Sequence, residues 1–136
     1  MNQAVPHIMS ANLPNPLPVL DLDAALEHTG GDRELLQQLC SVFAEECPRQ
    51  LEEVRVAVQS QTPRTIQRAA HKIKGSASVV GGIQASQAAQ QLELAAGTED
   101  MSRILASFET LCQAITDLQT SVVKLEKDIN IDGHDS

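Results

Sequence analysis

A chain of 136 residues is long enough for one domain with a single hydrophobic core. It has no Trp or Tyr and only two Phe, while Ala, Leu and Gln are abundant, so the composition favours helices over a β-sandwich or barrel. The net charge of −8 argues against nucleic acid or an anionic membrane surface as the main partner.

Residues 1–18, MNQAVPHIMSANLPNPLP, have neither the basic start of a signal peptide nor the unbroken apolar run of a membrane span. We expect them to form a flexible, Pro-rich leader, and we expect the protein to be cytoplasmic. Cys40, Cys47 and Cys112 show no CxxC pair and no zinc-ligand spacing. Buried reduced thiols are therefore expected rather than a disulfide scaffold.

The first predicted helix is short and covers residues 21–29, because the glycine pair that follows is a typical helix stop. Asp32 then provides the N-cap of a long helix predicted to continue to about residue 59. Pro48 lies inside this helix, but the apolar stripe continues in phase past it, so we expect a bend rather than an end. The stripe recurs at spacings of three and four: Leu36, Leu39, Phe43, Cys47, Leu51, Val54 and Val58.

Three further helices are predicted downstream. Thr62 is a typical N-cap and Pro63 is favoured at the first helical position, so the next helix should run to Val80 and stop at a second glycine pair. The following helix covers residues 83–96, with small residues on one face, and ends at Gly97. The last begins after Thr98 and carries apolar residues at alternating spacings of three and four: Phe108, Leu111, Ile115, Leu118, Val122 and Leu125.

These elements predict an all-α fold, an antiparallel four-helix bundle preceded by a short N-terminal helix. The bundle domain is expected to occupy residues 19–128, and residues 129–136 to form a flexible tail outside it. We expect the protein to be a monomer.

Charge is distributed unevenly along the chain. Between Glu53 and Glu93 there is no acidic residue, and five basic side chains give this segment a charge of +5: Arg55, Arg64, Arg68, Lys72 and Lys74. The rest of the chain therefore carries −13. The basic segment is either an anion site or an ordinary solvated helix face, and charge by itself does not decide between them.

A helical wheel places His71 about 160° from the core residue Ile73. The core stripe around Ile73 contains Ile66, Ala69, Ala70, Ala77 and Val80. The outer face contains Arg64, Arg68, Gly75 and Ser78 together with His71. Gln67 and Lys74 fall on one flank of that face, and Lys72 and Val79 fall on the other. His71 is therefore not positioned as a core histidine.

Several interpretations of His71 can be compared. A metal site is disfavoured because no other His or Cys lies three or four residues away, and Lys74-Gly75-Ser76 reverses the order that a P-loop needs. An ordinary exposed histidine remains the main alternative. Gly75 argues against it, because a glycine inside a helix costs roughly 1 kcal/mol relative to alanine and an outward one is best explained by the close approach of another molecule. An outward histidine, a nearby cation and a missing side chain suit phosphoryl transfer.

Glu93 is a candidate partner for the imidazole. If the two helices fold back at the second glycine pair, His71 and Glu93 are nearly level. The carboxylate could then accept a hydrogen bond from Nδ1–H and leave Nε2 unprotonated and nucleophilic. Gln90 is the alternative partner, and Glu93 could equally be an ordinary acid at the core boundary.

The motif His71-x-x-Lys74-Gly75-Ser76-Ala77, followed by Val80-Gly81 and then by Leu92-Glu93, resembles that of histidine-containing phosphotransfer (HPt) domains of multistep two-component relays. The resemblance extends from about residue 19 to residue 128. Members of this family typically have alanine at the position of Gly82, a departure expected to affect the helix stop rather than the chemistry.

The resemblance implies that His71 accepts a phosphoryl group from a receiver-domain aspartate or donates one to it, and that Lys74 helps to hold the group. The implied partners are a response-regulator receiver domain and a hybrid sensor histidine kinase. The docking surface would centre on Gly75, Ser78 and Val79, with Arg68 and Gln67 beside them. The implied role is a phosphoryl carrier rather than an enzyme, without a cofactor, because the catalytic groups come mainly from the partner.

Two other hypotheses remain. A scaffold or adaptor bundle that binds partners without phosphorylation requires the helix pattern and nothing more. Nucleic-acid binding through the basic segment is the third hypothesis, and the negative charge of the rest of the chain disfavours it.

Overall fold

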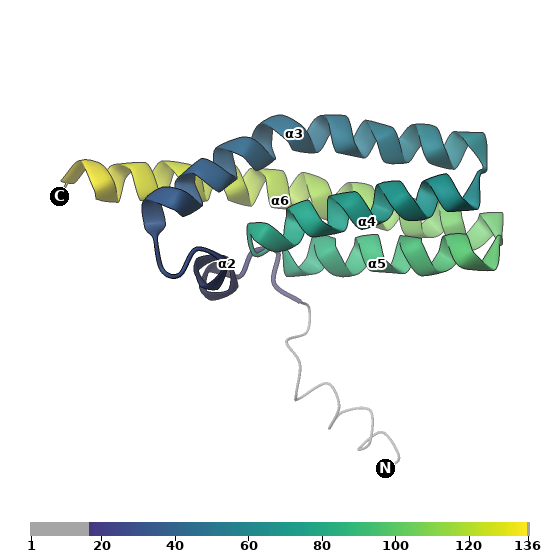
Figure 1. The fold of residues 1–136 in the computed structure, drawn as a ribbon, viewed down its shortest axis with the longest axis horizontal. Helices are drawn as coiled ribbons and strands as arrows, with labels where there is room; N and C mark the ends of the chain where they lie inside the picture. The colour runs from purple at the N-terminus through teal and green to yellow at the C-terminus, as the bar shows by residue number, and fades with distance from the viewer. Residues whose placement is uncertain (1–16, 136) are drawn as a thin grey trace, which may run out of the picture.

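The computed structural model of the protein describes residues 17–135, with side chains described as far as Ile129. Its helices are α2 (Leu22–His28), α3 (Arg33–Ser60), α4 (Pro63–Val79), α5 (Ile83–Thr98) and α6 (Met101–Asp135) (Figure 1). Residues 17–135 contain no strand. The predicted all-α class is confirmed.

The four long helices pack in a closed ring, in which α3 contacts α4, α4 contacts α5, α5 contacts α6, and α6 contacts α3. Short turns join them, so consecutive helices run in opposite directions (Figure 1). The short helix α2 contacts α3 and α4 and lies at the end of the bundle where α4 turns into α5. This arrangement is the predicted antiparallel bundle with a short helix before it.

The N-caps of the first two helices are aspartates. Asp21 Oδ1 accepts a hydrogen bond from the Ala24 amide at 3.1 Å, and Asp32 Oδ1 accepts one from the Leu35 amide at 3.0 Å. Thr62 occupies the N-cap of α4 but does not cap it, because its hydroxyl donates to the Ser60 carbonyl at 3.3 Å. The start of α4 therefore depends on Pro63, whose ring fixes φ and removes one amide that would lack a partner.

The turn between α5 and α6 differs from the prediction that Gly97 ends the helix. α5 continues to Thr98, and Glu99 takes the left-handed conformation with φ 59°. Gly97 is instead a packing position, because a Cβ there would lie 3.2 Å from Gln67 Nε2 on α4. Asp100 then caps α6 by accepting a hydrogen bond from the Ser102 amide at 3.0 Å.

α3 continues through Pro48, as predicted, and the first part of the helix is inclined to the rest (Figure 1). Leu39 and Leu51, which were predicted in the buried stripe, are only partly buried. Because α3 packs against both α4 and α6, its buried face is wider than one stripe. The buried residues are Leu36, Cys40, Phe43, Cys47, Gln50, Val54, Ala57 and Val58.

The cysteines are free thiols. Cys40 and Cys47 are buried, and desolvation raises the pKa of each thiol to about 11, with the Glu126 charge adding to the effect at Cys40. Cys112 is half-buried, and burial is also the main cause of its raised pKa. The expectation of buried thiols therefore holds for two of the three, and Cys112 is the exception.

At both ends of the described residues, the bundle extends past the boundaries predicted for it. The expected leader lies mostly outside the described residues, but Leu17 and Pro18 are attached to the bundle. Their carbonyls accept hydrogen bonds from the side chain and the amide of Gln84, each at 3.1 Å. At the other end, α6 does not stop near residue 128 but continues to Asp135, and Ile129 is 5% exposed.

The turn between α4 and α5 is tightly packed. Gly81 has φ 76°, its carbonyl accepts a hydrogen bond from the Asp21 amide at 2.7 Å, and a Cβ there would overlap the Asp21 carbonyl oxygen. A Cβ on Gly82 would overlap the Leu118 side chain of α6. The two glycines therefore allow α2 and α6 to approach the turn closely.

We predict that Gly81→Ala lowers the free energy of unfolding by roughly 1–3 kcal/mol more than Gly30→Ala does, because its Cβ would overlap the Asp21 carbonyl oxygen. Both positions have positive φ, so both variants carry the cost of placing alanine in the left-handed region, about 1–2 kcal/mol. At Gly30, however, a Cβ would meet no described atom within 4 Å. Urea unfolding followed by far-UV circular dichroism measures the difference. Equal losses in the two variants would contradict the close contact between Gly81 and Asp21.

Candidate functional site

His71 lies on the outer face of α4, and its side chain is 68% exposed. The opposite face of α4 is buried in the bundle through Ile66, Ala70, Ile73 and Ala77. Ala69, which the wheel placed in the core stripe, is only partly buried because it faces the space between α3 and α4. The amphipathic character of α4 thus directs the imidazole to solvent.

Glu93 of α5 lies beside His71, with 3.2 Å between Glu93 Oε2 and His71 Nδ1. The tight turn at Gly81 and Gly82 brings the two helices together, and the small buried residues Ala85, Ala88, Ala89 and Ala96 let α5 pack closely. A carboxylate can only accept a hydrogen bond, so in this contact Nδ1 carries the proton and the lone pair of the neutral ring is on Nε2. The arrangement directs a nucleophilic nitrogen away from the carboxylate.

Lys74 binds the other oxygen of the same carboxylate, with 3.2 Å between its Nζ and Glu93 Oε1. Among the described residues Glu93 Oε1 has no hydrogen-bond partner, so this contact is an ion pair without the alignment of a hydrogen bond. The Lys74 side chain is 25% exposed and that of Glu93 is 27% exposed. We call these three residues the His71–Glu93–Lys74 cluster.

A polar cavity of about 290 Å³ lies next to the cluster, between α4 and α5. It is lined by Gln67, Lys74, Gln90, Glu93, Leu94 and Gly97. Gln90, the alternative partner considered for the imidazole, belongs to this cavity, whereas the hydrogen bond at Nδ1 comes from Glu93.

The other residues predicted to form the site lie around His71 in three directions. Gly75 is exposed on the outer face, and a Cβ there would meet no described atom within 4 Å apart from its own helix backbone. Ser78 faces α5, where its hydroxyl shares a hydrogen bond with that of Ser86 at 2.9 Å. Gln67 also faces α5, whereas Val79 and Arg68 line spaces between α4 and α3.

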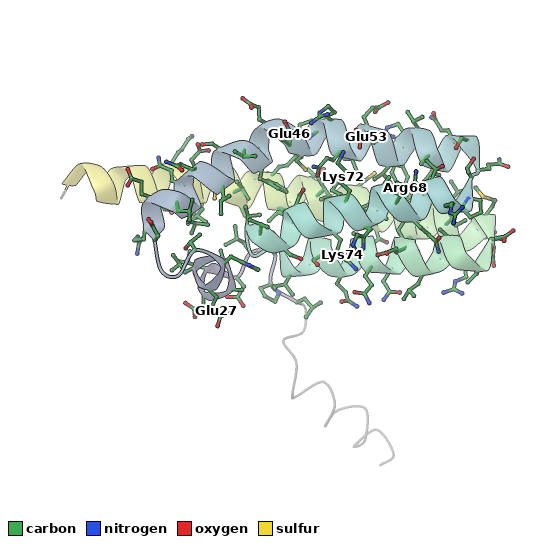
Figure 2. All side chains as sticks on the ribbon, in the orientation of Figure 1. Glu27, Glu46, Glu53, Arg68, Lys72 and Lys74 are labelled. Atoms are coloured by element: carbon green, nitrogen blue, oxygen red, sulfur yellow. The ribbon has the colours of Figure 1, made fainter. Side chains whose placement is uncertain are left out.

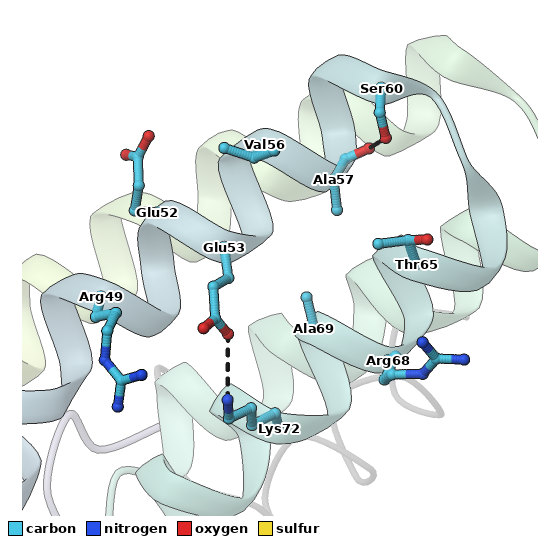
Figure 3. A pocket seen from close by; sticks show the side chains of 10 residues that line it. All are labelled: Arg49, Glu52, Glu53, Val56, Ala57, Ser60, Thr65, Arg68, Ala69 and Lys72. Carbon is cyan, nitrogen blue, oxygen red and sulfur yellow. Dashed lines mark hydrogen bonds and ion pairs between the residues drawn. The ribbon is translucent and has the colours of Figure 1, made fainter.

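A groove of about 580 Å³ runs between α3 and α4 on the Arg68 side (Figure 3). Val56, Ala57 and Ala69 provide its apolar walls. An ion pair between Lys72 Nζ and Glu53 Oε1, at 3.3 Å, joins the two helices across it. Figure 2 shows Lys72 and Arg68 on the α3 side of α4 and Lys74 on the α5 side.

Sequence reasoning missed Ser86 and Gln50. Ser78 and Ser86 are each four residues from Gly82, so the same argument that paired His71 with Glu93 could have found them. Gln50 is 7% exposed, its Oε1 has no described hydrogen-bond partner, and it lines a smaller cavity of about 210 Å³ with Ser76 and Val79. Gln50 is a polar residue on α3, so nothing in the sequence pattern indicates that its side chain is buried.

Among the side chains that the structure describes, residues 17–129, no group of three or more His, Cys, Asp or Glu is arranged to hold a metal ion. The same part of the chain has no helix that is both long and apolar enough to cross a bilayer.

Comparison with known proteins gives two matches. A family model described as the Hpt domain matches residues 38–121, a span that contains the whole cluster. The crystal structure of the HPT domain from an Hpt sensor hybrid histidine kinase of Shewanella is similar, with a TM-score of 0.71 and 16% identity over 81% of this chain and 95% of that chain. At that identity the structural match concerns the fold. No curated protein matches the chain significantly.

We predict that Gly75→Ala raises the free energy of unfolding by up to about 1 kcal/mol, because alanine favours helix and the site offers open space for its methyl group. Gly97→Ala is the matched control, since its methyl group would press on Gln67 and gain less. Chemical denaturation of both variants measures the effect. A loss of stability in Gly75→Ala would mean that this glycine has a packing role.

We also predict that Glu93→Ala lowers the fraction of neutral His71 rings that carry their proton on Nδ1, because the acceptor that holds that proton is removed. The nitrogen chemical shifts of the two ring positions, from two-bond ¹H–¹⁵N correlation spectra, report the tautomer ratio. Glu53→Ala removes a carboxylate paired with Lys72 instead and should leave the ratio unchanged. An unchanged ratio in Glu93→Ala would show that Glu93 does not orient the ring.

Proposed function

Because the chain belongs to the Hpt domain family, we propose that it is a phosphoryl carrier in a two-component phosphorelay, with residues 19–128 as the phosphotransfer domain. His71 is the phosphoryl acceptor in this proposal. The observation that carries the assignment is the exposed imidazole whose Nδ1 lies 3.2 Å from a carboxylate, because this contact leaves the lone pair on the outer nitrogen.

That geometry supports the following transfer step. His71 Nε2 attacks the phosphorus of a receiver-domain aspartyl phosphate, a bond from nitrogen to phosphorus forms, and the bond from phosphorus to the aspartyl oxygen breaks. The electron pair of the broken bond leaves with the aspartate carboxylate. In the reverse direction, an aspartate of a receiver attacks the phosphoryl group and the imidazole leaves with Nδ1 still protonated.

Glu93 and Lys74 have separate roles in this proposal. Glu93 orients the ring and stabilises the positive charge that develops on it when Nε2 is phosphorylated. Lys74, one helical turn from His71, supplies a cation for the phosphoryl oxygens. Both residues position or stabilise the reacting group, whereas the in-line geometry is supplied by the partner that binds over it.

The proposed partners are the receiver domain of a response regulator and a hybrid sensor histidine kinase. Docking would occur over Gly75, where the absence of a side chain lets a partner approach the imidazole, and over Ser78 and Val79 beside it. Arg68 and Gln67 would flank that contact on the α3 and α5 sides. A relay partner must also leave, so the interface should be small and transient.

In this proposal the protein acts as a monomer in the cytoplasm and needs no cofactor of its own. The alternative role, an adaptor bundle that binds partners without being phosphorylated, would not depend on the identity of residue 71.

We predict that His71→Gln abolishes phosphotransfer and leaves the bundle folded, because the side chain of residue 71 is 68% exposed. The protein is incubated with receiver domains phosphorylated by acetyl phosphate, and acid-labile phosphate on the protein is measured. His28→Gln, at the end of α2, is the matched control and should be labelled normally. Normal labelling of His71→Gln would refute the assignment.

A further inference from the structure

The two oxygens of the Glu93 carboxylate bind different partners, and this arrangement has a consequence for the phosphorylated protein. Resting on the proposed function, we infer that Lys74 changes partner during the cycle. It pairs with Glu93 while His71 is unmodified and with the phosphoryl group once His71 is phosphorylated. Glu93 thereby competes for the cation that stabilises the phosphorylated state, which makes Glu93 a positioning residue for Lys74 as well as for the imidazole.

The geometry supports this competition. Glu93 Oε2 lies 3.2 Å from His71 Nδ1, and Glu93 Oε1 lies 3.2 Å from Lys74 Nζ. The carboxylate therefore links the imidazole to the ammonium. The hydrogen bond with His71 Nδ1 uses only Glu93 Oε2. Lys74 can therefore leave Oε1 without any rotation of the imidazole ring.

The charge balance of the cluster also supports it. In the unmodified protein the Glu93 carboxylate and the Lys74 ammonium offset each other beside the imidazole. A phosphoryl group on His71 adds between one and two negative charges and three strong acceptor oxygens, one helical turn from Lys74. Lys74 sits on a flexible four-carbon stem, and its contact with Oε1 lacks hydrogen-bond alignment, so it can exchange one anion for the other.

Two neighbouring cations, Lys72 and Arg68, lie on the α3 side of α4. The Lys72 ammonium pairs with Glu53 at 3.3 Å, and Arg68 lines the groove between α3 and α4. Lys74 is the cation that faces α5 with Glu93. The phosphoryl group and Glu93 therefore draw on the same ammonium.

The polar cavity contains side chains that can donate a hydrogen bond to Glu93 Oε1 after Lys74 has left it. Glu93 Oε1 is buried, so it needs a new donor when the ammonium moves. Gln67 and Gln90 line the same cavity as Glu93, and each has an amide that can donate a hydrogen bond. Their presence lowers the cost of the exchange.

Phosphoramidate tests the inference without a protein partner. The neutral His71 ring attacks phosphorus through Nε2, the bond from phosphorus to the amino nitrogen of phosphoramidate breaks, and ammonia leaves with its electron pair. The Nδ1 proton stays directed at residue 93. Forward rates with phosphoramidate and reverse rates with added ammonia, followed by ³¹P NMR, yield the equilibrium ratio of phosphorylated to unmodified His71.

The experiment is a double-mutant cycle on this ratio. Lys74→Gln should lower the ratio of phosphorylated to unmodified His71 in the unsubstituted protein. In the Glu93→Gln background the same substitution should lower the ratio by a factor about two to five times larger, because there Lys74 has no carboxylate partner in the unmodified state. Glu93→Gln keeps an oxygen that can accept from Nδ1–H, so the ring stays oriented. The matched control is Glu53→Gln, which removes the same charge from the Lys72 pair and should leave the effect of Lys74→Gln unchanged.

A direct measurement accompanies the cycle. The ¹⁵N resonance of Lys74 Nζ in the unsubstituted protein should shift when His71 is phosphorylated. Equal effects of Lys74→Gln in the two backgrounds, or an unmoved Nζ resonance, would overturn the change of partner while leaving His71 as the phosphoryl acceptor. If phosphoramidate leaves His71 of the unsubstituted protein unmodified, the proposed function is overturned, and this inference with it.

Discussion

The close antiparallel packing of α4 on α5 is the constraint on which the site depends. His71 and Lys74 belong to one helix and Glu93 to the other, so their contacts exist only while the two helices stay in register. The turn at Gly81 and Gly82 sets that register. The Asp21 amide stabilises the turn by donating a hydrogen bond to the Gly81 carbonyl. Small side chains along α5 then keep the helices near each other over their length. Local geometry at one turn therefore controls distances at a site ten residues away.

On α4, the buried residues stabilise the bundle and the exposed residues form the site. The core residues of α4 are fully enclosed, whereas the imidazole is exposed enough for a partner to reach it. Glu93 is intermediate, because its carboxylate lies at the seam between the helices, where water screens it less than at an open surface. An ion pair at such a position responds more strongly to a new charge nearby than a surface pair would. The site thus combines access for a partner with sensitivity to phosphorylation.

Most of the fold follows from local sequence signals, because each acts over one or two helical turns. The Asp32 cap, the glycine pairs, the proline at the start of α4 and the spacing of apolar residues predicted the helices and their class. The errors occur where a helix contacts two neighbours. Leu39 and Leu51 leave the core of α3 because its buried face is shared between α4 and α6, and Gly97 is a packing position for Gln67 rather than a helix stop. Ile129 is buried although it lies beyond the expected end of the bundle.

The sequence by itself determined the helices, the outward direction of His71 and the position of Glu93 level with His71 on the next helix. These features depend on the helical repeat and on the number of residues from a glycine pair. Tertiary structure decided which atoms meet. The Lys74–Glu93 ion pair, the groove bridged by Lys72 and Glu53, and the buried amide of Gln50 all depend on the separation and rotation of neighbouring helices. Side-chain packing across the whole bundle sets those two quantities, and no short segment of the sequence encodes them.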